Sequence, residues 1–244
     1  MQKYFIRHRL SVRDTTFLSD SDSELAISRR LLKLEDLVEI ETLEKIFLGQ
    51  VVDILPSSIE IEILKEIEDR KPEHKPSITL IQSLSNDTKF NYFVEKSVEI
   101  GIEKIIPVES QYSLKKAKEA MKDIQYWEKI IKDATEQSRN SSPTLIYEPV
   151  VLKNLDIDEF SNCEKICLAT ESIETSPLED FLKNTNIKKP FVIAIGPEKG
   201  WSSSDLAFFR NMGFEFISLK GNILRTETTG LVIASIIKYL KGEI

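Results

Sequence analysis

The sequence predicts an α/β protein in two parts, a small all-β region followed by a larger region built on a parallel sheet. Three observations predict this class. From residue 78 onwards, short apolar runs alternate with amphipathic stretches, as they do in βαβ units. Within about the first 68 residues, β-like runs dominate instead. Between the two regions lies "EDRKPEHKPS", a charged segment that proline interrupts twice, which is typical of a connection between domains.

The N-terminal region contains three β-like runs. They are "DLVEIET", "KIFLGQVVDI" and the alternating "SIEIEIL" from Ser58 to Leu64. Runs of this length and spacing predict a small β-barrel or sheet. We place the domain boundary near residue 75, which gives a first domain of residues 1–74 and a second domain of residues 75–244.

The second region opens with a strand, a helix and a strand. "SITLIQSL" predicts a buried strand, "NYFVEKSVEIG" a helix that ends at Gly101, and "KIIPVES" the next strand. The alternation then continues through "AMKDIQYWEKIIKDATEQS", "KICLATES", "PLEDFLKN", "PFVIAIG", "SSSDLAFFRNMG", "FEFISL" and "TTGLVIASIIKYLK". Such regularity favours crossover connections, with helices covering a parallel sheet.

Composition excludes several classes of protein. A chain of 244 residues with a hydrophobic share of 41% can bury a substantial core. No apolar segment approaches the roughly 20 residues that cross a bilayer, and the N-terminus lacks a signal-like apolar run, so we expect a soluble cytoplasmic protein. The two cysteines and the two histidines, His8 and His74, lack the spacing of metal ligands, so we expect no metal.

Charge is informative only near the N-terminus. The net charge of −7 does not indicate a polyanionic partner. The first 33 residues differ, because seven basic residues against four acidic ones leave a local excess of +3. That excess suits local contacts with phosphates, although ordinary solvated arginines would give the same charge. The candidate phosphate contacts are Arg7, Arg9, Arg29 and Arg30.

Three predicted strand ends carry unusual residues. They are "LATES" at 168–172, "IGPEKGW" at 195–201 and "SLKGNILRTETTG" at 218–230. Ligands of α/β proteins bind beyond the carboxyl ends of the strands, so we expect a site there. Gly196 and Gly200 permit close backbone approach, and one of the three serines at 202–204 offers a cap to the next helix.

The ligand class follows from what these loops lack and contain. Neither G-x-x-x-x-G-K-[ST] nor G-x-G-x-x-G is present, which disfavours a triphosphate or pyrophosphate site. The apolar residues Ile195, Leu219, Ile223 and Leu224 suit an adenine and ribose held largely by backbone groups. A plain strand-to-helix turn is the alternative for "GPEKG" alone.

The stretch "ILRTETTG" weakens that alternative. Thr226 or Thr228 would suffice as the cap of the apolar helix that follows. Arg225 and Glu227 are then not needed for structure, so Arg225 is the leading candidate for chemistry or for holding a phosphate.

These motifs resemble those of the RsmE family of 16S ribosomal RNA uridine N3-methyltransferases, within the SPOUT superfamily. The family carries I-G-P-E-G-G-[FW] after a strand and S-L-G-x-x-I-L-R-x-E-T-A near its C-terminus. The matching stretches here are "IGPEKGW" and "SLKGNILRTETT". "KFNYFVEKSVEIGIEKIIPVES" and "DATEQS" match further upstream, so the resemblance covers most of residues 78–240. The N-terminal region fits more loosely, through "RRLLKLEDLVEI".

The resemblance implies a SPOUT domain with a deep trefoil knot, a PUA-like RNA-binding β-barrel ahead of it, and a homodimer that acts on 16S rRNA of the small ribosomal subunit. The implied cofactor is S-adenosyl-L-methionine. Implied contacts to it are Thr170, Ile195, Gly196, Pro197, Gly200, Leu219, Gly221, Ile223, Leu224 and Thr226. For catalysis, Arg225 is expected to stabilise charge on a uracil carbonyl, and Glu198 or Glu227 to accept the proton of N3 or orient the donor.

The sequence departs from the family pattern at several positions. Lys199 and Lys220 replace glycines, Asn222 stands where arginine is common, and Glu35 replaces the glycine of a Gly-Asp turn. Two alternatives therefore stay open: an RNA-binding or ribosome-assembly protein of SPOUT fold that has lost methyl transfer, and a SPOUT methyltransferase with another RNA target. The missing phosphate loop disfavours an unrelated nucleotide hydrolase.

Overall fold

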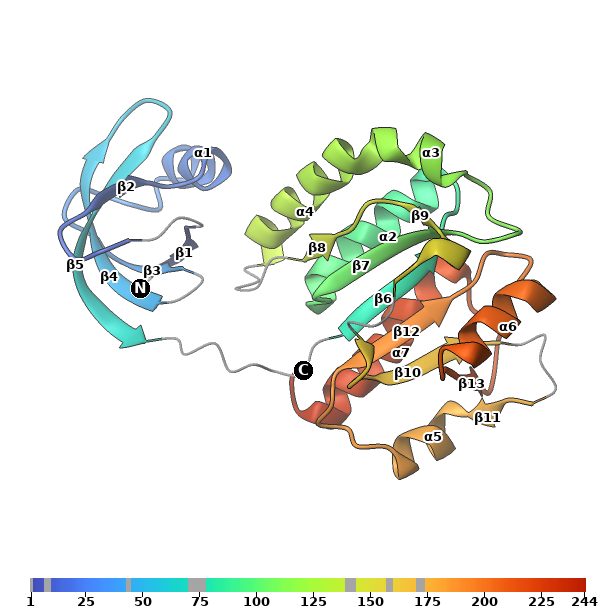
Figure 1. Ribbon diagram of the computed structural model, residues 1–244. Coiled ribbons are helices and arrows are strands. Elements are labelled where there is room, and N and C mark those ends of the chain that lie inside the picture. The colour runs from blue at the N-terminus through green and yellow to red at the C-terminus, as the bar shows by residue number, and fades with distance from the viewer. Residues whose placement is uncertain are drawn as a thin grey trace. The chain divides into compact units, whose positions relative to one another are not determined.

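The chain divides into two compact units, Met1–Lys75 and Pro76–Ile244, each with its own sheet and its own hydrophobic core (Figure 1). The computed structural model describes residues 2–6, 10–42, 45–69, 78–138, 144–156, 160–169 and 174–244. Within these ranges, no helix is both long enough and apolar enough to cross a membrane.

The N-terminal unit is a five-stranded sheet with one helix. Its elements are β1 (Gln2–Phe5), β2 (Thr15–Phe17), α1 (Asp20–Ser28), β3 (Leu37–Glu41), β4 (Lys45–Ile54) and β5 (Ile59–Asp69). The strand order is β1-β3-β4-β5-β2, with β1 parallel to β3 and the other neighbours antiparallel. Among the described residues β1 and β2 are edges that do not pair with each other. The sheet is therefore mixed and not closed, unlike the expected barrel, because a β2 of 3 residues pairs only with β5.

Apolar alternation along these strands creates the core of this unit. Val38 and Ile40 of β3 are fully buried, as are Ile61 and Ile63 of β5, and they pack in one cluster with side chains from α1 and β4. Among the residues of this unit that the structure describes, the non-glycine residues with a positive φ are Arg13 at 78°, Arg30 at 51° and Glu35 at 68°.

The C-terminal unit is an eight-stranded parallel sheet with the path β11-β13-β10-β12-β6-β7-β8 and with β9 paired to β7. Its strands are β6 (Ile78–Ser83), β7 (Lys104–Glu109), β8 (Leu145–Ile146), β9 (Val150–Val151), β10 (Glu164–Leu168), β11 (Ser176–Pro177), β12 (Phe191–Ile195) and β13 (Glu215–Ser218). Its helices are α2 (Asp87–Ile100), α3 (Ala117–Ala120), α4 (Ile124–Ser138), α5 (Leu178–Asn184), α6 (Ser203–Asn211) and α7 (Thr226–Lys241), with short 3₁₀ turns η1 (Met121–Asp123) and η2 (Leu152–Asn154). The predicted α/β class with a parallel sheet is confirmed.

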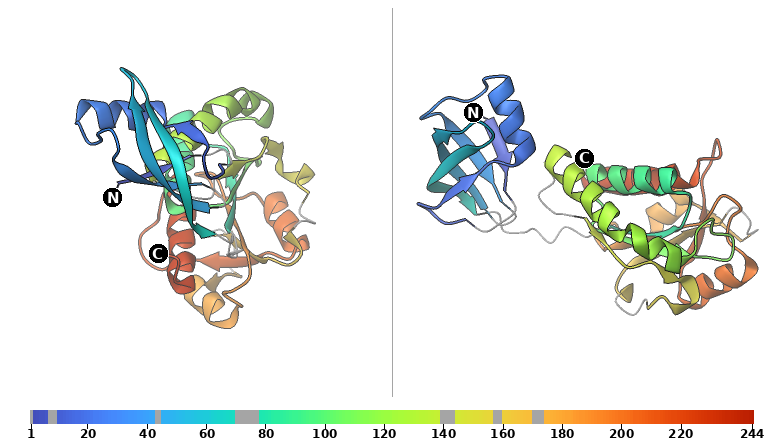
Figure 2. Two further views of the ribbon diagram at one scale, coloured as in Figure 1. Left: turned by 90° about the vertical axis from the view of Figure 1, so that its left-hand side faces the viewer. Right: turned by 90° about the horizontal axis from the view of Figure 1, so that it is seen from above.

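Both faces of this sheet are covered (Figure 2). Phe191, Ile193 and Ile195 of β12 pack in one cluster with side chains of α2, α4, α5 and α7. Val192 and Ala194 of the same strand belong to the opposite cluster, with side chains of α6. Side chains of one strand alternate between the two faces of a sheet, so the all-apolar β12 contributes side chains to both hydrophobic clusters.

Capping sets the limits of α2, which leads away from the central strand β6. The side chain of Asn86 accepts a hydrogen bond from the N–H of Lys89, as an N-cap does. Gly101 ends the helix in the left-handed conformation at φ 77°, and its N–H bonds back to the last turn. The predicted helix end at Gly101 is confirmed.

Candidate active site

The exits of β12 and β13 meet in one cavity of about 500 Å³. It is lined by Lys89, Leu168, Ile195, Gly196, Pro197, Glu198, Gly200, Trp201, Ile223, Leu224, Arg225, Thr226 and Thr229. Most of the residues predicted for the site thus lie around a single hollow at the carboxyl edge of the sheet. Leu219, Gly221 and Glu227 belong to the same stretches but do not line it. Thr170 falls outside the described residues.

The exit of β12 is a tight turn. Gly200 has φ 75°, and its N–H donates to the carbonyl of Pro197 at 2.9 Å. A Cβ at Gly196 would lie 3.2 Å from the indole of Trp201, whose Nε1–H donates to the carbonyl of Leu168 at 3.1 Å. Glycine at 196 therefore lets the indole pack against the turn. Lys199 is exposed and is not among the described residues with positive φ, so its turn position does not require glycine.

The same turn leads into α6. Ser202 is the N-cap: its hydroxyl accepts from the N–H of Asp205, and the carboxylate of Asp205 accepts from the N–H of Ser202. This is a capping box, and it identifies which of the three serines serves as the cap.

The exit of β13 approaches the first exit through a buried hydroxyl. Thr226 Oγ1 donates to the carbonyl of Gly196 at 2.6 Å and accepts from Gln82 Nε2 at 3.0 Å. Three segments far apart in sequence are thereby joined: the end of β6, the turn after β12 and the first residue of α7. The other amide atom, Gln82 Oε1, is buried without a hydrogen-bond partner.

The start of α7 differs from the expectation. The N-cap is Arg225, which makes no side-chain cap hydrogen bond, so neither Thr226 nor Thr228 caps the helix. Thr226 is instead the first helical residue, and Thr229 Oγ1 donates back to the carbonyl of Arg225 at 2.8 Å. Thr226 thus ties the helix start to the turn after β12, whereas Thr229 bonds within the start of its own helix.

Among the described residues, four charged side chains lie in or beside the cavity wall. Lys89 Nζ lies 2.7 Å from Glu198 Oε1, and the hydrogen bond to Glu198 places the pKa of Lys89 above its ordinary value of 10.5. Arg225 Nη1 lies 3.9 Å from Glu227 Oε1, in a loose pair between a side chain that is 80% exposed and one that is 10% exposed. Glu227 Oε2 is buried without a hydrogen-bond partner. The cavity is thus flanked by two cations and two carboxylates.

Several lining residues were missed by the sequence analysis. Lys89 and Thr229 belong to stretches quoted for other reasons, and Leu168 and Trp201 were included only within motifs. Gln82, which holds Thr226, ends a strand that was predicted only as buried. The signal available for Lys89 was a cation within the first turn of a helix, where cations are unfavourable.

The predicted RNA contacts lie in the N-terminal unit. Arg29 and Arg30 follow α1 and are exposed. Arg7 and Arg9 fall outside the described residues.

The positions that depart from the family pattern do not line the cavity. Lys220 is 76% exposed at its side chain, and its Nζ lies 3.8 Å from Glu179. Asn222 is also exposed.

Comparison with known proteins gives matches over most of the chain. A family model described as RNA methyltransferase domain matches residues 72–238. "Ribosomal RNA small subunit methyltransferase E" of Aquifex aeolicus is 31% identical over 186 residues, which are 73% of this chain and 75% of that protein. The protein of the same name from Buchnera aphidicola (subsp. Acyrthosiphon pisum) is 28% identical over 244 residues, 99% of this chain and 94% of its own length.

Solved structures share the fold. A ribosomal RNA small subunit methyltransferase E of Neisseria gonorrhoeae, bound to S-adenosyl methionine, has a TM-score of 0.76 at 24% identity and covers 98% of both chains. A probable rRNA-methyltransferase of Porphyromonas gingivalis has a TM-score of 0.78 at 20% identity and covers 99% of both chains. The family is shown by the sequence matches, which extend over more than half of the chain: the chain belongs to the RNA methyltransferase family, in the group of the ribosomal RNA small subunit methyltransferase E proteins.

Proposed function

We propose that this chain is an S-adenosylmethionine-dependent methyltransferase that acts on N3 of a uridine in the 16S RNA of the small ribosomal subunit. The observation that supports it most is the single cavity between the exits of β12 and β13, placed where α/β sheets bind ligands. Family membership supports the RNA substrate. The Neisseria gonorrhoeae neighbour, which binds S-adenosyl methionine, supports the methyl donor.

The cavity residues fit the adenosyl part of this donor. A volume of about 500 Å³ is typical of small-molecule sites. Ile195, Leu168 and Leu224 supply apolar lining, while Gly196 and Gly200 contribute backbone to the cavity wall. When bound, the donor supplies a methyl group on positively charged sulfur.

Methyl transfer to uracil N3 requires loss of the N3 proton, because a protonated imide nitrogen has no free in-plane lone pair. Glu198 is the carboxylate among the described residues that line the cavity, and we assign the proton to it. Arg225 lines the same cavity and stabilises the negative charge that develops on a uracil carbonyl. Glu227 does not line the cavity, and its position 3.9 Å from Arg225 suits a role in orienting that guanidinium.

The N-terminal unit is proposed to bind RNA as the PUA-like domain of the family does. Arg29 and Arg30 are exposed, and Arg7 and Arg9 add to the basic character of the first 33 residues. Contacts of arginine with phosphate release counterions, so RNA affinity should fall steeply as salt is added. Because the proposed substrate is ribosomal, we propose a cytoplasmic location.

The chain path supports a knotted C-terminal region. In the sheet, β13 is separated from β12 by β10, yet α7, which follows β13, packs on β12 and β6. The chain after β13 therefore returns across a strand and past the turn that follows β12. We propose that this return forms the trefoil knot of the SPOUT superfamily.

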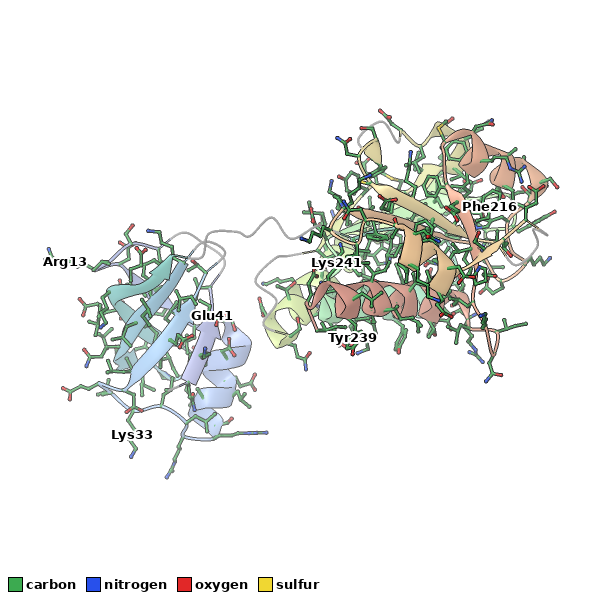
Figure 3. All side chains as sticks on the ribbon, turned by 90° about the horizontal axis from the view of Figure 1, so that it is seen from below. Arg13, Lys33, Glu41, Phe216, Tyr239 and Lys241 are labelled. Carbon is green, nitrogen blue, oxygen red and sulfur yellow. The ribbon has the colours of Figure 1, made fainter. Side chains whose placement is uncertain are left out.

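A homodimer is proposed to form through α7. Ile236, Tyr239 and Leu240 are 38%, 71% and 51% exposed, and their spacing puts them on one face of α7. Figure 3 shows Tyr239 on this helix. Tyr92 of the neighbouring α2 is 49% exposed as well. An apolar helix face of this kind suits a second copy of the chain.

The deciding experiment measures tritium transfer from labelled S-adenosylmethionine into small-subunit RNA. Arg225→Ala should lower turnover by about 100-fold, the loss typical of removing one charge-stabilising donor. Arg210→Ala is the matched control, because Arg210 lies on α6, pairs with Glu174 and does not line the cavity. Unchanged turnover in Arg225→Ala would remove this residue from the mechanism.

Two further measurements separate the alternatives. Reverse-transcription stops map the methylated base, because N3 methylation blocks Watson–Crick pairing, and stops in another RNA would indicate a different target. Calorimetry with S-adenosylmethionine tests the RNA-binding alternative, since a protein that had lost the donor site would release no heat of binding.

A further inference from the structure

Lys89 lines the cavity, and the electrostatics of its own helix do not favour a cation at this position. It lies in the first turn of α2, where the partial positive charge of the helix N-terminus opposes a cation. The acidic residue of that turn, Asp87, is engaged elsewhere, because Lys115 Nζ lies 2.6 Å from its carboxylate. Lys89 Nζ instead reaches Glu198 Oε1 at 2.7 Å, across 109 positions of sequence.

The pair lies at the rim of the cavity. Both side chains line it, and they are 27% and 31% exposed, between the buried lining and the solvent. An exposed pair of this kind contributes little to stability. Its position suggests that the pairing matters for the charge distribution of the site.

The charges of Lys89 and Glu198 affect how the positively charged donor binds and reacts. This step rests on the proposed function. As methyl transfer proceeds, the bond between N3 and the methyl carbon forms. The bond between carbon and sulfur breaks, and its electron pair stays on sulfur. The positive charge on sulfur disappears in this step. An unpaired carboxylate in the cavity would attract the charged donor and lose that attraction in the transition state, so the donor would bind more tightly and react more slowly.

We propose that Lys89 is a positioning residue that holds the Glu198 carboxylate at the rim and cancels its attraction for the sulfonium of the donor. Glu198 then remains available to the incoming base without stabilising the charged reactant. Lys89 acts through Glu198 and need not touch the donor.

The test compares two ligands that differ in charge. S-adenosylhomocysteine lacks the methyl group and the positive charge of S-adenosylmethionine, so the ratio of their dissociation constants reports the charge term separately from shape. Isothermal titration calorimetry on the full chain should show that Lys89→Met favours S-adenosylmethionine over S-adenosylhomocysteine by a further threefold to tenfold, roughly, relative to the unmodified chain. Lys89→Arg should keep the original ratio, and the double variant Lys89→Met with Glu198→Gln should restore it.

A matched control is available on the same helix. Lys96 pairs with Glu95 and Glu99 and does not line the cavity, so Lys96→Met should leave the ratio unchanged. Circular dichroism of each variant establishes that it is folded. Equal weakening of both ligands by Lys89→Met would make Lys89 a purely structural contact and overturn the proposal, as would an unchanged ratio. Failure of the unmodified chain to bind either ligand would instead refute the proposed function itself.

Discussion

Glu35 occupies a turn position that favours glycine. Its φ of 68° lies in the left-handed region, and its N–H donates to the carbonyl of Val51 at 2.9 Å, so pairing with β4 holds the strained conformation. We expect Glu35→Gly to stabilise the N-terminal unit by about 0.5–1 kcal/mol, and slower hydrogen exchange of amides in β3 and β4 would measure this. Glu24→Gly on the exposed side of α1 is the control and should destabilise by about 1 kcal/mol. Faster exchange in Glu35→Gly would contradict the assignment of strain.

Removal of the Thr226 hydroxyl should lower the stability of the C-terminal unit. Thr226→Val keeps the shape but leaves the Gly196 carbonyl and the Gln82 amide N–H unpaired in a buried setting. We expect a loss of about 1–3 kcal/mol, measured by thermal unfolding, together with weaker binding of S-adenosylmethionine. Thr226→Ser retains the hydroxyl and should stay near the original stability. Equal losses in both variants would contradict the hydrogen-bond assignment, because Thr226→Ser keeps the hydroxyl.

Some residues around the cavity could be predicted from the sequence, and others could not. Gly196 and Arg225 lie in contiguous stretches with more glycine and charge than a plain turn needs, so they could be predicted. The contacts of Lys89 and Gln82 could not be predicted, because their partners lie 109 and 144 positions away and only the fold brings them together. The role of Thr226 was misjudged for the same reason: a threonine before a helix usually caps it, and its contact to Gly196 depends on the β12 turn.

At the scale of elements, Glu109 links the end of β7 to the start of α3. Its Oε2 accepts from the N–H of Ala117 at 2.8 Å, and its Oε1 lies 3.1 Å from Lys116 Nζ. Burial acts to raise the pKa of Glu109, but the Ala117 N–H and Lys116 outweigh it, so the pKa lies below its ordinary value of 4.5. The ionised carboxylate therefore stabilises the folded state.

The sign of the pH dependence follows from that lowered pKa. The contribution of Glu109 is complete above the pKa of the unfolded chain and is lost as the pH falls through the lower pKa of the folded state. Glu109→Gln should thus cost about 1–2 kcal/mol at pH 7 and progressively less below pH 4.5, as measured by urea unfolding at several pH values. Glu128→Gln, at an exposed position of α4, serves as the comparison. A difference that grows toward acid pH would contradict the assignment.

Most elements could be predicted where the sequence gives a long enough pattern. The apolar run of β12 and the cap and glycine of α2 left little ambiguity. The strands β8, β9 and β11 have 2 residues each, too few for any periodicity, and they exist because longer neighbours offer free edges. In the N-terminal unit β1, β2 and α1 were missed because their short runs mix polar and apolar residues without a clear period. The expected closed barrel also depended on pairing between edge strands, which a single sequence does not report.

For the whole molecule, α7 contributes to both the inside and the outside of the C-terminal unit. Its inner residues Ile233, Ala234 and Ile237 are fully buried against the sheet and α2. Its outer residues Ile236, Tyr239 and Leu240 stay exposed, which leaves an apolar face on the helix that begins at Thr226. A partner on this face would bury it and would brace the helix whose first turn carries the site.

We therefore expect a homodimer in solution that Tyr239→Glu disrupts. A carboxylate placed at a side chain that is 71% exposed in the single chain costs the folded monomer little, but in a closed interface it would be buried without a partner. Sedimentation velocity should show the original chain at twice the mass of the variant at micromolar concentration. Tyr126→Glu is the matched control, since Tyr126 is 56% exposed on α4, and it should remain dimeric. A monomeric original chain would refute the dimer, and a dimeric Tyr239→Glu would exclude this face of α7 as its interface.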